Sequence, residues 1–356
     1  MAKALELAVQ GRGRVSPNPM VGAVLVKSGR IVGRGYHREY GGAHAEVEAL
    51  KEAGGRARGA TMYVTMEPCC FHGKTPACTD AIARAGVAEV VAATLDPHEK
   101  VHGKGMRCLR RAGIRASTGT MSARARELNE AYFTFHRLGR PFVTLKLAAT
   151  LDGMVSTSSG ESQWISGPKA RRRAQELRCE SDAVLVGVNT VLNDDPRLTC
   201  RALKGKRLLR VVLDSNLRVP PGAQLLRGRD AVLVVTTVCP GRKAKLLRER
   251  GAEVARVRAG RSGRPRWRDV LVELRRRSIV RLLVEGGAEV ASSALEEGVV
   301  DRVVVIHAPM LLGPGRSLTA AMRGRRLERA IRLRRVSHEE LGDDVVTTGY
   351  VPKGRR

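Results

Sequence analysis

Residues 67–78 read Glu-Pro-Cys-Cys-Phe-His-Gly-Lys-Thr-Pro-Ala-Cys and follow the short apolar run Met62-Tyr-Val-Thr65. Upstream, His44-Ala45-Glu46 lies at the start of a segment with helical spacing of its apolar residues, which predicts a helix over residues 43–53. A helix, a short strand and a loop rich in Cys and His therefore succeed one another. This order predicts an α/β fold with the Cys and His side chains at the ends of its elements.

The same alternation extends to both sides of this stretch. The further expected elements are a helical start at residues 5–8, a hairpin of residues 21–26 and 31–36, helices at 79–85, 105–112 and 122–135, and a strand at 90–94. Leu138-Gly-Arg-Pro141 then interrupts the pattern. We therefore place a domain boundary near residue 139.

Residues 140–356 alternate again and predict a second α/β domain with a mostly parallel sheet. Strands are expected at 142–150, 183–187, 208–213, 231–236, 281–284 and 302–307, and helices near 168–178, 242–250, 268–276 and 288–296. Residues 258–268, rich in Arg and Gly, read as an exposed loop. The chain thus divides into domains 1–139 and 140–356.

The composition, 43% hydrophobic and 28% charged residues in a chain of 356, is that of a globular protein with a large core. The longest run without a charged residue, 303–315, is too short to span a bilayer, and the N-terminus does not resemble a signal peptide. We expect a cytoplasmic protein. Its seven cysteines favour thiols, a metal site or catalysis over a disulfide framework.

The net charge of +29 is, taken alone, typical of a nucleic-acid-binding protein. The excess is however spread along the chain, +9 in residues 1–139 and +20 in residues 140–356. Only 3% of the residues are aromatic, which leaves little for base stacking. We interpret the charge as a solvated, arginine-biased surface that also favours anionic small substrates.

One imidazole and two thiolates, from His44, Cys69 and Cys78, would give zinc three protein ligands and leave the fourth position open for water. Glu46, two residues after His44, could take a proton from that water and hand it to a leaving amine. Cys70 and His72 lie between the two cysteines and remain competing ligands. A closed structural zinc knuckle is the alternative, although such a site needs no Glu beside its His.

His-x-Glu followed by Pro-Cys and a further Cys resembles the signature of zinc-dependent base deaminases. The usual Cys-x-x-Cys spacing is replaced here by eight residues between Cys69 and Cys78. That long loop resembles a variant of one family, the bifunctional deaminase/reductase of riboflavin biosynthesis. The motifs that carry the resemblance are Ser16-Pro-Asn-Pro-Met-Val-Gly-Ala-Val24, Gly35-Tyr-His37, His44-Ala-Glu-Val47, Glu67-Pro-Cys-Cys70 and His72-Gly-Lys-Thr-Pro-Ala-Cys78.

The resemblance covers essentially the whole chain and implies a cytidine-deaminase-like α/β/α domain followed by a dihydrofolate-reductase-like α/β domain. It implies that Cys69 and Cys78 are the ligands with His44, and that Cys70 is not a ligand. Lys74 and Thr75 would hold the substrate phosphate, and Asn18 would bind the pyrimidine edge. A lysine point charge suits a phosphate.

The second domain lacks the Gly-x-Gly-x-x-Gly fingerprint of Rossmann folds. Glu285-Gly-Gly287 instead ends a strand and leads into a helix at Ala288, which suits a pyrophosphate but is equally typical of a tight structural turn. The segments 147–153, 160–165, 187–196, 213–215 and 284–287 resemble the reductase half of the family.

The resemblance implies two sets of contacts in the second domain. The NADPH contacts would be Ala148, Trp164, Thr190, Asp194, Ser215, Gly287, Ala288, Glu289, Val290, Ala291, Ser292 and Ser293. The substrate contacts would be Lys146, Ser162, Arg178, Leu198, Arg201 and Glu285, with Lys146 beside the reacting sugar. Guanidinium groups such as those of Arg178 and Arg201 suit a ribose phosphate.

The segment Leu213-Asp-Ser-Asn-Leu-Arg218 bears on the choice of cofactor. Ser215, Asn216 and Arg218 could all donate to a 2′-phosphate, whereas Asp214 would repel it. Alternation along an extended segment should turn Asp214 away from the face that presents Ser215. We therefore expect NADPH rather than NADH.

These observations predict a two-step enzyme with Zn²⁺ and NADPH as cofactors. It would deaminate a phosphorylated diaminopyrimidine and then reduce its ribosyl side chain, as a homo-oligomer without nucleic-acid or membrane partners. Two alternatives stay open. One is a tRNA or nucleic-acid base deaminase with a basic accessory domain, whose binding would weaken steeply with salt. The other is a non-enzymatic, zinc-stabilised binding protein.

Overall fold

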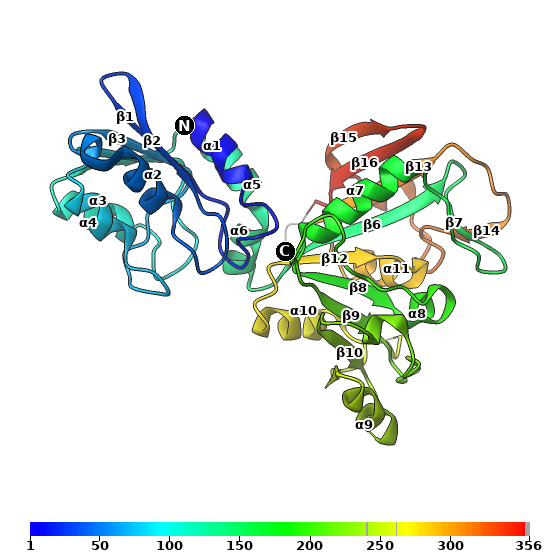
Figure 1. The fold of residues 1–356 in the computed structure, drawn as a ribbon. Helices are drawn as coiled ribbons and strands as arrows, with labels where there is room; N and C mark the ends of the chain where they lie inside the picture. Colours follow the sequence, from blue (N-terminus) through cyan, green and yellow to red (C-terminus); the bar gives the residue numbers. More distant parts are fainter. Residues whose placement is uncertain (240, 261, 353–356) are drawn as a thin grey trace. The chain divides into compact units, whose positions relative to one another are not determined.

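The computed structural model describes residues 1–239, 241–260 and 262–352. The chain divides into two compact units, Met1–Gly139 and Arg140–Arg356, at the break between Leu138 and Pro141. Each unit is built on its own sheet (Figure 1). In the described residues, no helix has both the length and the apolar character needed to span a bilayer.

Unit 1 has a five-stranded sheet in the order β2-β1-β3-β4-β5. The strands are β1 Gly22–Lys27, β2 Arg30–Tyr36, β3 Thr61–Val64, β4 Glu89–Ala92 and β5 Arg115–Thr118. The helices are α1 Ala2–Val9, α2 Ala45–Ala53, α3 Cys78–Arg84, α4 Lys104–Arg111, α5 Ser122–Leu128 and α6 Glu130–Leu138, with a short 3₁₀ turn, η1 Gly54–Ala57. Strand β1 is antiparallel to β2 and β3, and the remaining pairs are parallel.

Two glycines let helices approach the two faces of this sheet closely. A Cβ on Gly22 would meet the backbone of α1 at 2.0 Å, and one on Gly35 would meet the backbone of α2 at 2.2 Å. Helices α2, α3 and α4 share a core with the sheet, whereas α1 and α5 pack together elsewhere around Leu5. The layers are therefore α/β/α, as the resemblance implies.

Unit 2 has a nine-stranded sheet in the order β11-β10-β9-β8-β12-β6-β13-β16-β15, and a small sheet of β7 and β14. The strands are β6 Phe142–Thr150, β7 Met154–Thr157, β8 Ala183–Gly187, β9 Leu209–Leu213, β10 Val232–Thr236, β11 Ala252–Arg256, β12 Arg281–Glu285, β13 Arg302–Ala308, β14 Gly315–Ser317, β15 Arg334–Leu341 and β16 Asp344–Tyr350. The helices are α7 Pro168–Cys179, α8 Val188–Asp194, α9 Arg242–Glu249, α10 Trp267–Arg276 and α11 Ala288–Glu296, with 3₁₀ turns η2 Gln224–Leu226 and η3 Leu327–Arg329.

The large sheet of unit 2 is covered on both faces, which is why its central strands are apolar throughout. Helices α10 and α11 pack on one face, around Trp267 and Leu145. Helices α8 and α9 pack with Val184 and Val212 on the other face, where α7 joins through Leu177. The seven strands that follow one another in the sheet from β11 to β13 (β11, β10, β9, β8, β12, β6 and β13) all run parallel, as expected from the sequence.

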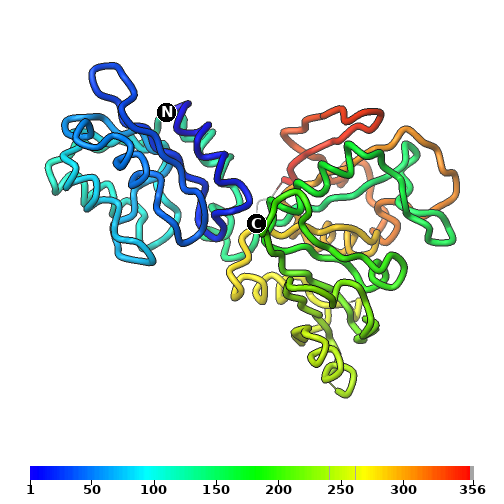
Figure 2. Tube along the Cα trace, in the orientation of Figure 1, coloured from blue at the N-terminus to red at the C-terminus, as the bar shows by residue number. Residues whose placement is uncertain are grey.

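Several elements differ from the expectations. No strand was predicted for the C-terminal hairpin β15–β16, which is red in Figure 2. Strand β16 pairs antiparallel with β13, and the hairpin thereby extends the sheet. The helical stretch 122–135 is two helices, because the Asn129 side chain bonds the backbone of Met20 at the break between α5 and α6. Within the expected loop 258–268, Trp267 is buried and starts α10, and residue 261 lies outside the described residues.

The cysteines also depart in part from expectation. Cys179 and Cys200 form a disulfide, with Cα atoms 5.1 Å apart. Cys69, Cys70, Cys78, Cys108 and Cys239 are free thiols. The expectation of thiols and a metal site therefore fits unit 1, and one cross-link was not foreseen in unit 2.

Candidate active sites

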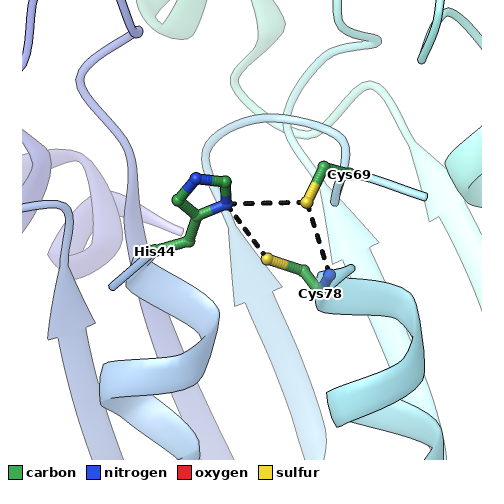
Figure 3. A group of neighbouring side chains, drawn as sticks. All are labelled: His44, Cys69 and Cys78. Atoms are coloured by element: carbon green, nitrogen blue, oxygen red, sulfur yellow. Dashed lines mark hydrogen bonds between the residues drawn. The ribbon is translucent and has the colours of Figure 1, made fainter. Parts of the chain in front are cut away.

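Three side chains of unit 1 converge from the ends of three elements (Figure 3). His44 is the N-cap of α2, Cys78 is the first residue of α3, and Cys69 follows β3. His44 Nδ1 lies 3.2 Å from Cys78 Sγ and 3.5 Å from Cys69 Sγ. All the potential ligand atoms lie within 4.8 Å of one another. One nitrogen and two sulfurs at this separation fit the donor set of a zinc site with an open position.

The protonation of the two cysteines also suits a metal. The Cys78 thiol donates to Cys69, and this bond lowers the pKa of Cys69 to about 4. The same pairing raises the pKa of Cys78. A divalent cation at this site would favour the thiolate form of both cysteines.

The two competing ligands lie elsewhere. Cys70 Sγ is 3.8 Å from the carbonyl oxygen of Lys100, and His72 is an exposed side chain 3.8 Å from the Asp80 carboxylate. Within the described residues, the only group of three metal-binding side chains is the one formed by His44, Cys69 and Cys78. The geometry thus agrees with the ligand set that the resemblance implies.

Glu46 lies in the first turn of α2 and is only 3% exposed. Burial raises the pKa of its carboxyl to about 7, and the carboxyl also interacts with the Cys78 thiol. A buried carboxyl beside the ligands, rather than among them, matches the role of a proton carrier.

The three side chains expected to hold the substrate lie on neighbouring segments. Thr75 Oγ1 is 3.5 Å from His44 Nε2, and Lys74 Nζ lies 4.1 Å from the centre of the Tyr40 ring. Asn18 Nδ2 is 3.1 Å from His37 Nε2. His37, for which the sequence predicts no role, thereby orients Asn18.

Glu67 is a positioning residue, a role that its place in the Glu-Pro-Cys-Cys motif does not predict. Its buried carboxylate accepts hydrogen bonds from the backbone N–H groups of Gly103 at 2.9 Å and Met106 at 3.0 Å. It thereby caps α4 and fixes the chain two residues before Cys69. The signal was a Glu next to Pro at a strand end, which sequence alone does not distinguish from a surface carboxylate.

Unit 2 contains a cavity of about 1740 Å³ at the carboxyl ends of its parallel strands, the edge at which open α/β sheets bind ligands. All six expected substrate residues line it: Lys146, Ser162, Arg178, Leu198, Arg201 and Glu285. So do most of the expected cofactor residues: Ala148, Trp164, Thr190, Asp194, Ser215, Gly287, Ala288, Glu289, Val290 and Ser293.

Ala291 and Ser292, the remaining two of the expected cofactor residues, do not line this cavity. Ala291 packs in the core between α11 and the sheet, and Ser292 is 1% exposed. A helix turns about 100° per residue, so consecutive residues of α11 cannot all face the cavity. The polar lining residues that were not predicted include Arg171, Gln175 and Asn189. Arg171 and Gln175 precede Arg178 by seven and three residues in α7, so helical spacing was the available signal.

Lys146, Arg178 and Glu285 form a charged cluster in the wall of the cavity. Glu285 accepts hydrogen bonds from Arg178 Nε at 2.8 Å and Nη2 at 2.6 Å. Burial alone would raise the pKa of Glu285, but Arg178 and Lys146 bring it below its ordinary value. Burial lowers the pKa of Lys146. A lysine with a lowered pKa beside a carboxylate that is held in place is typical of an active site.

Family models match both units. A model described as the cytidine and deoxycytidylate deaminase zinc-binding region matches residues 1–94, and the RibD C-terminal domain matches residues 141–347. The fold and the two sites therefore define a zinc-binding deaminase domain joined to a reductase domain.

Relatives match over nearly the full length. The riboflavin biosynthesis protein RibD of Aquifex aeolicus is 45% identical over 347 residues, covering 97% of this chain and 96% of its own. The RibD structure from Acinetobacter baumannii superposes with a TM-score of 0.90 at 35% identity, covering 99% of this chain and 98% of its own. A deaminase/reductase structure from Thermotoga maritima gives a TM-score of 0.87 at 36% identity, with 99% and 97% covered. The chain belongs to the RibD family of bifunctional deaminase/reductases.

Proposed function

We propose that this chain performs two successive steps of riboflavin biosynthesis, one in each unit. Residues 1–139 would remove an amino group from a diamino-ribosylamino-pyrimidinone phosphate, and residues 140–356 would reduce the ribosyl side chain of the product to ribityl with NADPH. The observation that carries the proposal is the convergence of His44, Cys69 and Cys78 within 4.8 Å beside buried Glu46.

In the deamination, zinc held by the three ligands supplies Lewis-acid activation of water. Glu46 takes a proton from the attacking water and returns it to the leaving amine, so the ring carbon gains oxygen and loses ammonia. Burial of Glu46 excludes bulk water from this exchange. Because Glu46 is fixed in the first turn of α2, its carboxylate keeps one position relative to His44 through the reaction.

The substrate is held by groups on the rim of this site. Lys74 is exposed beside the Tyr40 ring, where its ammonium group can reach a phosphate, while Thr75 lies beside His44 and offers a hydroxyl. Asn18, oriented by His37, presents its amide to the pyrimidine edge. The charge of Lys74 fits the terminal phosphate of such a substrate.

In the reduction, NADPH supplies the hydride, and the residues of unit 2 position the two reactants. All six expected substrate residues and most of the expected cofactor residues line one cavity, which supports this division of roles. In this proposal Lys146 would face the reacting sugar, where a proton must reach the ring oxygen as the ribose opens. Arg178 holds Glu285 and so keeps Lys146 near a fixed negative charge.

Membership of the RibD family disfavours the two alternatives raised by the sequence, a base deaminase acting on nucleic acid and a non-enzymatic scaffold. The deciding experiment incubates the purified, zinc-loaded protein with the diaminopyrimidine phosphate. We expect ammonia release without NADPH, and one NADPH oxidised per product when NADPH is added. Ammonia release from a nucleic-acid substrate alone, or none from the pyrimidine phosphate, would reject the proposal.

A further inference from the structure

The Cys179–Cys200 disulfide lies directly beside two residues of the reductase cavity. Cys179 follows Arg178 at the end of α7, and Cys200 precedes Arg201 in the irregular chain between α8 and β9. Both arginines line the cavity, whereas neither sulfur does. The cross-link thus joins the backbones that carry the two guanidinium groups without occupying the site itself.

The two arginines differ in how firmly they are held. Arg178 is a helical residue whose guanidinium is paired with Glu285, and its Nη1 donates to the carbonyl oxygen of Thr199 at 3.2 Å. Arg201 is exposed and belongs to the segment 196–202. Within the described residues, this segment forms no backbone–backbone hydrogen bond. Arg201 therefore depends on side-chain contacts for its position.

The side-chain contacts of Arg201 are made with α7. With its amide oxygen facing the guanidinium groups, Gln175 accepts from Arg201 Nη2 at 3.1 Å and from Arg178 Nη1 at 3.2 Å. Its amide nitrogen then donates to the carbonyl oxygen of Thr199 at 3.2 Å. The disulfide is the one covalent link in this set, and it spans 21 positions of the sequence.

We propose that the Cys179–Cys200 disulfide is a positioning device for substrate binding in the reductase site. It keeps the backbone of Arg201 close to that of Arg178, so that the Arg201 guanidinium meets the phosphate of the substrate beside the Arg178–Glu285 pair. The inference rests on the proposed function, since it takes a phosphorylated pyrimidine as the ligand. When the cross-link is opened, hydrogen bonds from Gln175 and Arg178 still tie Thr199 and Arg201 to α7, but the covalent restraint is lost. Binding of the phosphate must then offset the cost of ordering Arg201.

The test compares the protein before and after treatment with a trialkylphosphine. The phosphine breaks the S–S bond by giving two electrons, water supplies the oxygen of the phosphine oxide, and two protons from that water end on the sulfurs. We expect KM for the deaminated pyrimidine phosphate to rise about tenfold, equivalent to about 1.4 kcal/mol of binding. We expect little change in kcat, in KM for NADPH or in ammonia release, because Lys146, the cofactor residues and unit 1 do not depend on the cross-link.

Two variants and one substrate serve as controls. The double variant Cys179→Ser/Cys200→Ser should show the raised KM from the outset and no response to phosphine. Cys239→Ser removes an exposed thiol of the same unit and should behave as wild type. KM for the dephosphorylated pyrimidine should not change when the disulfide is reduced, because this substrate has no phosphate for Arg201 to bind.

A thiol count in denaturant with a chelator should find five free thiols in the untreated protein and seven after reduction. Seven thiols at the start, or an unchanged KM after complete reduction, would overturn the inference. A fall in kcat and in thermal stability with KM unchanged would mean that the bond is merely structural. Failure of the proposed function would look different, because the untreated wild type would then not oxidise NADPH at all.

Discussion

Lys146 and Glu285 are direct partners in the parallel register of β6 and β12, at the centre of the large sheet. Their side chains therefore leave the sheet on the same face, with Arg178 bonded to both carboxylate oxygens of Glu285. The side chains of Lys146 and Arg178 thus share the Glu285 carboxylate in the partly buried wall of the unit 2 cavity. Removing the carboxylate would leave both cations without compensation.

Glu285→Gln should destabilise the protein by about 3 kcal/mol at neutral pH, the usual scale for breaking a buried pair. The pKa of Glu285 lies below its ordinary value of 4.5, so its contribution is complete above that pH. The contribution is lost as the pH falls through the lowered pKa, and the gap between variant and wild type should shrink there.

The measurement is the free energy of unfolding of unit 2 in urea, followed by tryptophan fluorescence at neutral and at acidic pH. Glu339→Gln is the matched control, because Glu339 is 56% exposed and 3.8 Å from Arg173, and exposed pairs contribute about 0–1 kcal/mol. A gap of the same size at both pH values would show that the carboxylate charge is not the cause.

Cys69→Ser and Cys78→Ser should each lose the zinc ion, whereas Cys70→Ser should keep about one zinc per chain. The reason is that Cys70 Sγ is directed toward Lys100 and not toward His44. Metal analysis of the purified variants decides this. Zinc lost from the Cys70 variant and kept by the Cys78 variant would refute the ligand assignment.

Glu46→Gln should keep zinc and lower the rate of ammonia release about 100- to 10,000-fold, because the amide preserves shape but carries no proton. Glu48→Gln is the control on the same helix, since Glu48 points to Arg38 at 3.4 Å. NADPH oxidation with the deaminated pyrimidine should be unaffected in both variants. A parallel loss of reductase activity would contradict the independence of the two units.

Lys74→Ala should raise KM for the diaminopyrimidine phosphate about tenfold with zinc content unchanged, because Lys74 supplies a point charge to the phosphate. Lys51, an exposed lysine in the last turn of α2, provides the control Lys51→Ala. Initial rates of ammonia release over a range of substrate give both constants. Equal KM values in the two variants would remove Lys74 from the substrate site.

Periodicity in the sequence was enough for the sheet cores and for the division near residue 139, because buried parallel strands such as β8 are apolar throughout. The hairpin β15–β16 escaped prediction, since β15 is exposed along nearly its whole length and carries no apolar pattern. Its pairing with β13 depends on a partner far away in the chain.

The zinc ligands were predictable because their chemistry is carried by residue types that are rare elsewhere. Arginines are common throughout this chain, so Arg178 and Arg201 were recognised through the resemblance, and Arg171 was missed although its guanidinium lies 4.8 Å from the centre of the Trp164 ring. The Cys179–Cys200 cross-link was missed for a related reason. Spacing along the sequence does not reveal which thiols the fold brings within bonding distance.

The last prediction concerns the choice of cofactor. Ser215, Asn216 and Arg218 line the cavity just beyond β9, and Arg218 Nη2 donates to Asn189 Oδ1 at 2.7 Å. Asp214 is fully buried, and its carboxylate accepts from the backbone N–H of Val219 at 2.8 Å. The carboxylate that would repel a 2′-phosphate therefore faces the protein interior, as the alternation predicts.

We therefore expect kcat/KM to be higher with NADPH than with NADH, and Arg218→Ala to reduce this preference. A hydrogen bond from a charged donor contributes about 1.5–3 kcal/mol, which corresponds to a loss of roughly 10- to 100-fold in the ratio. Arg229→Ala is the matched control, because Arg229 is exposed on the same unit and does not line the cavity. Equal kcat/KM values for NADPH and NADH in the wild type would reject the preference for NADPH. An unchanged ratio of the two values in Arg218→Ala would reject only the role of Arg218.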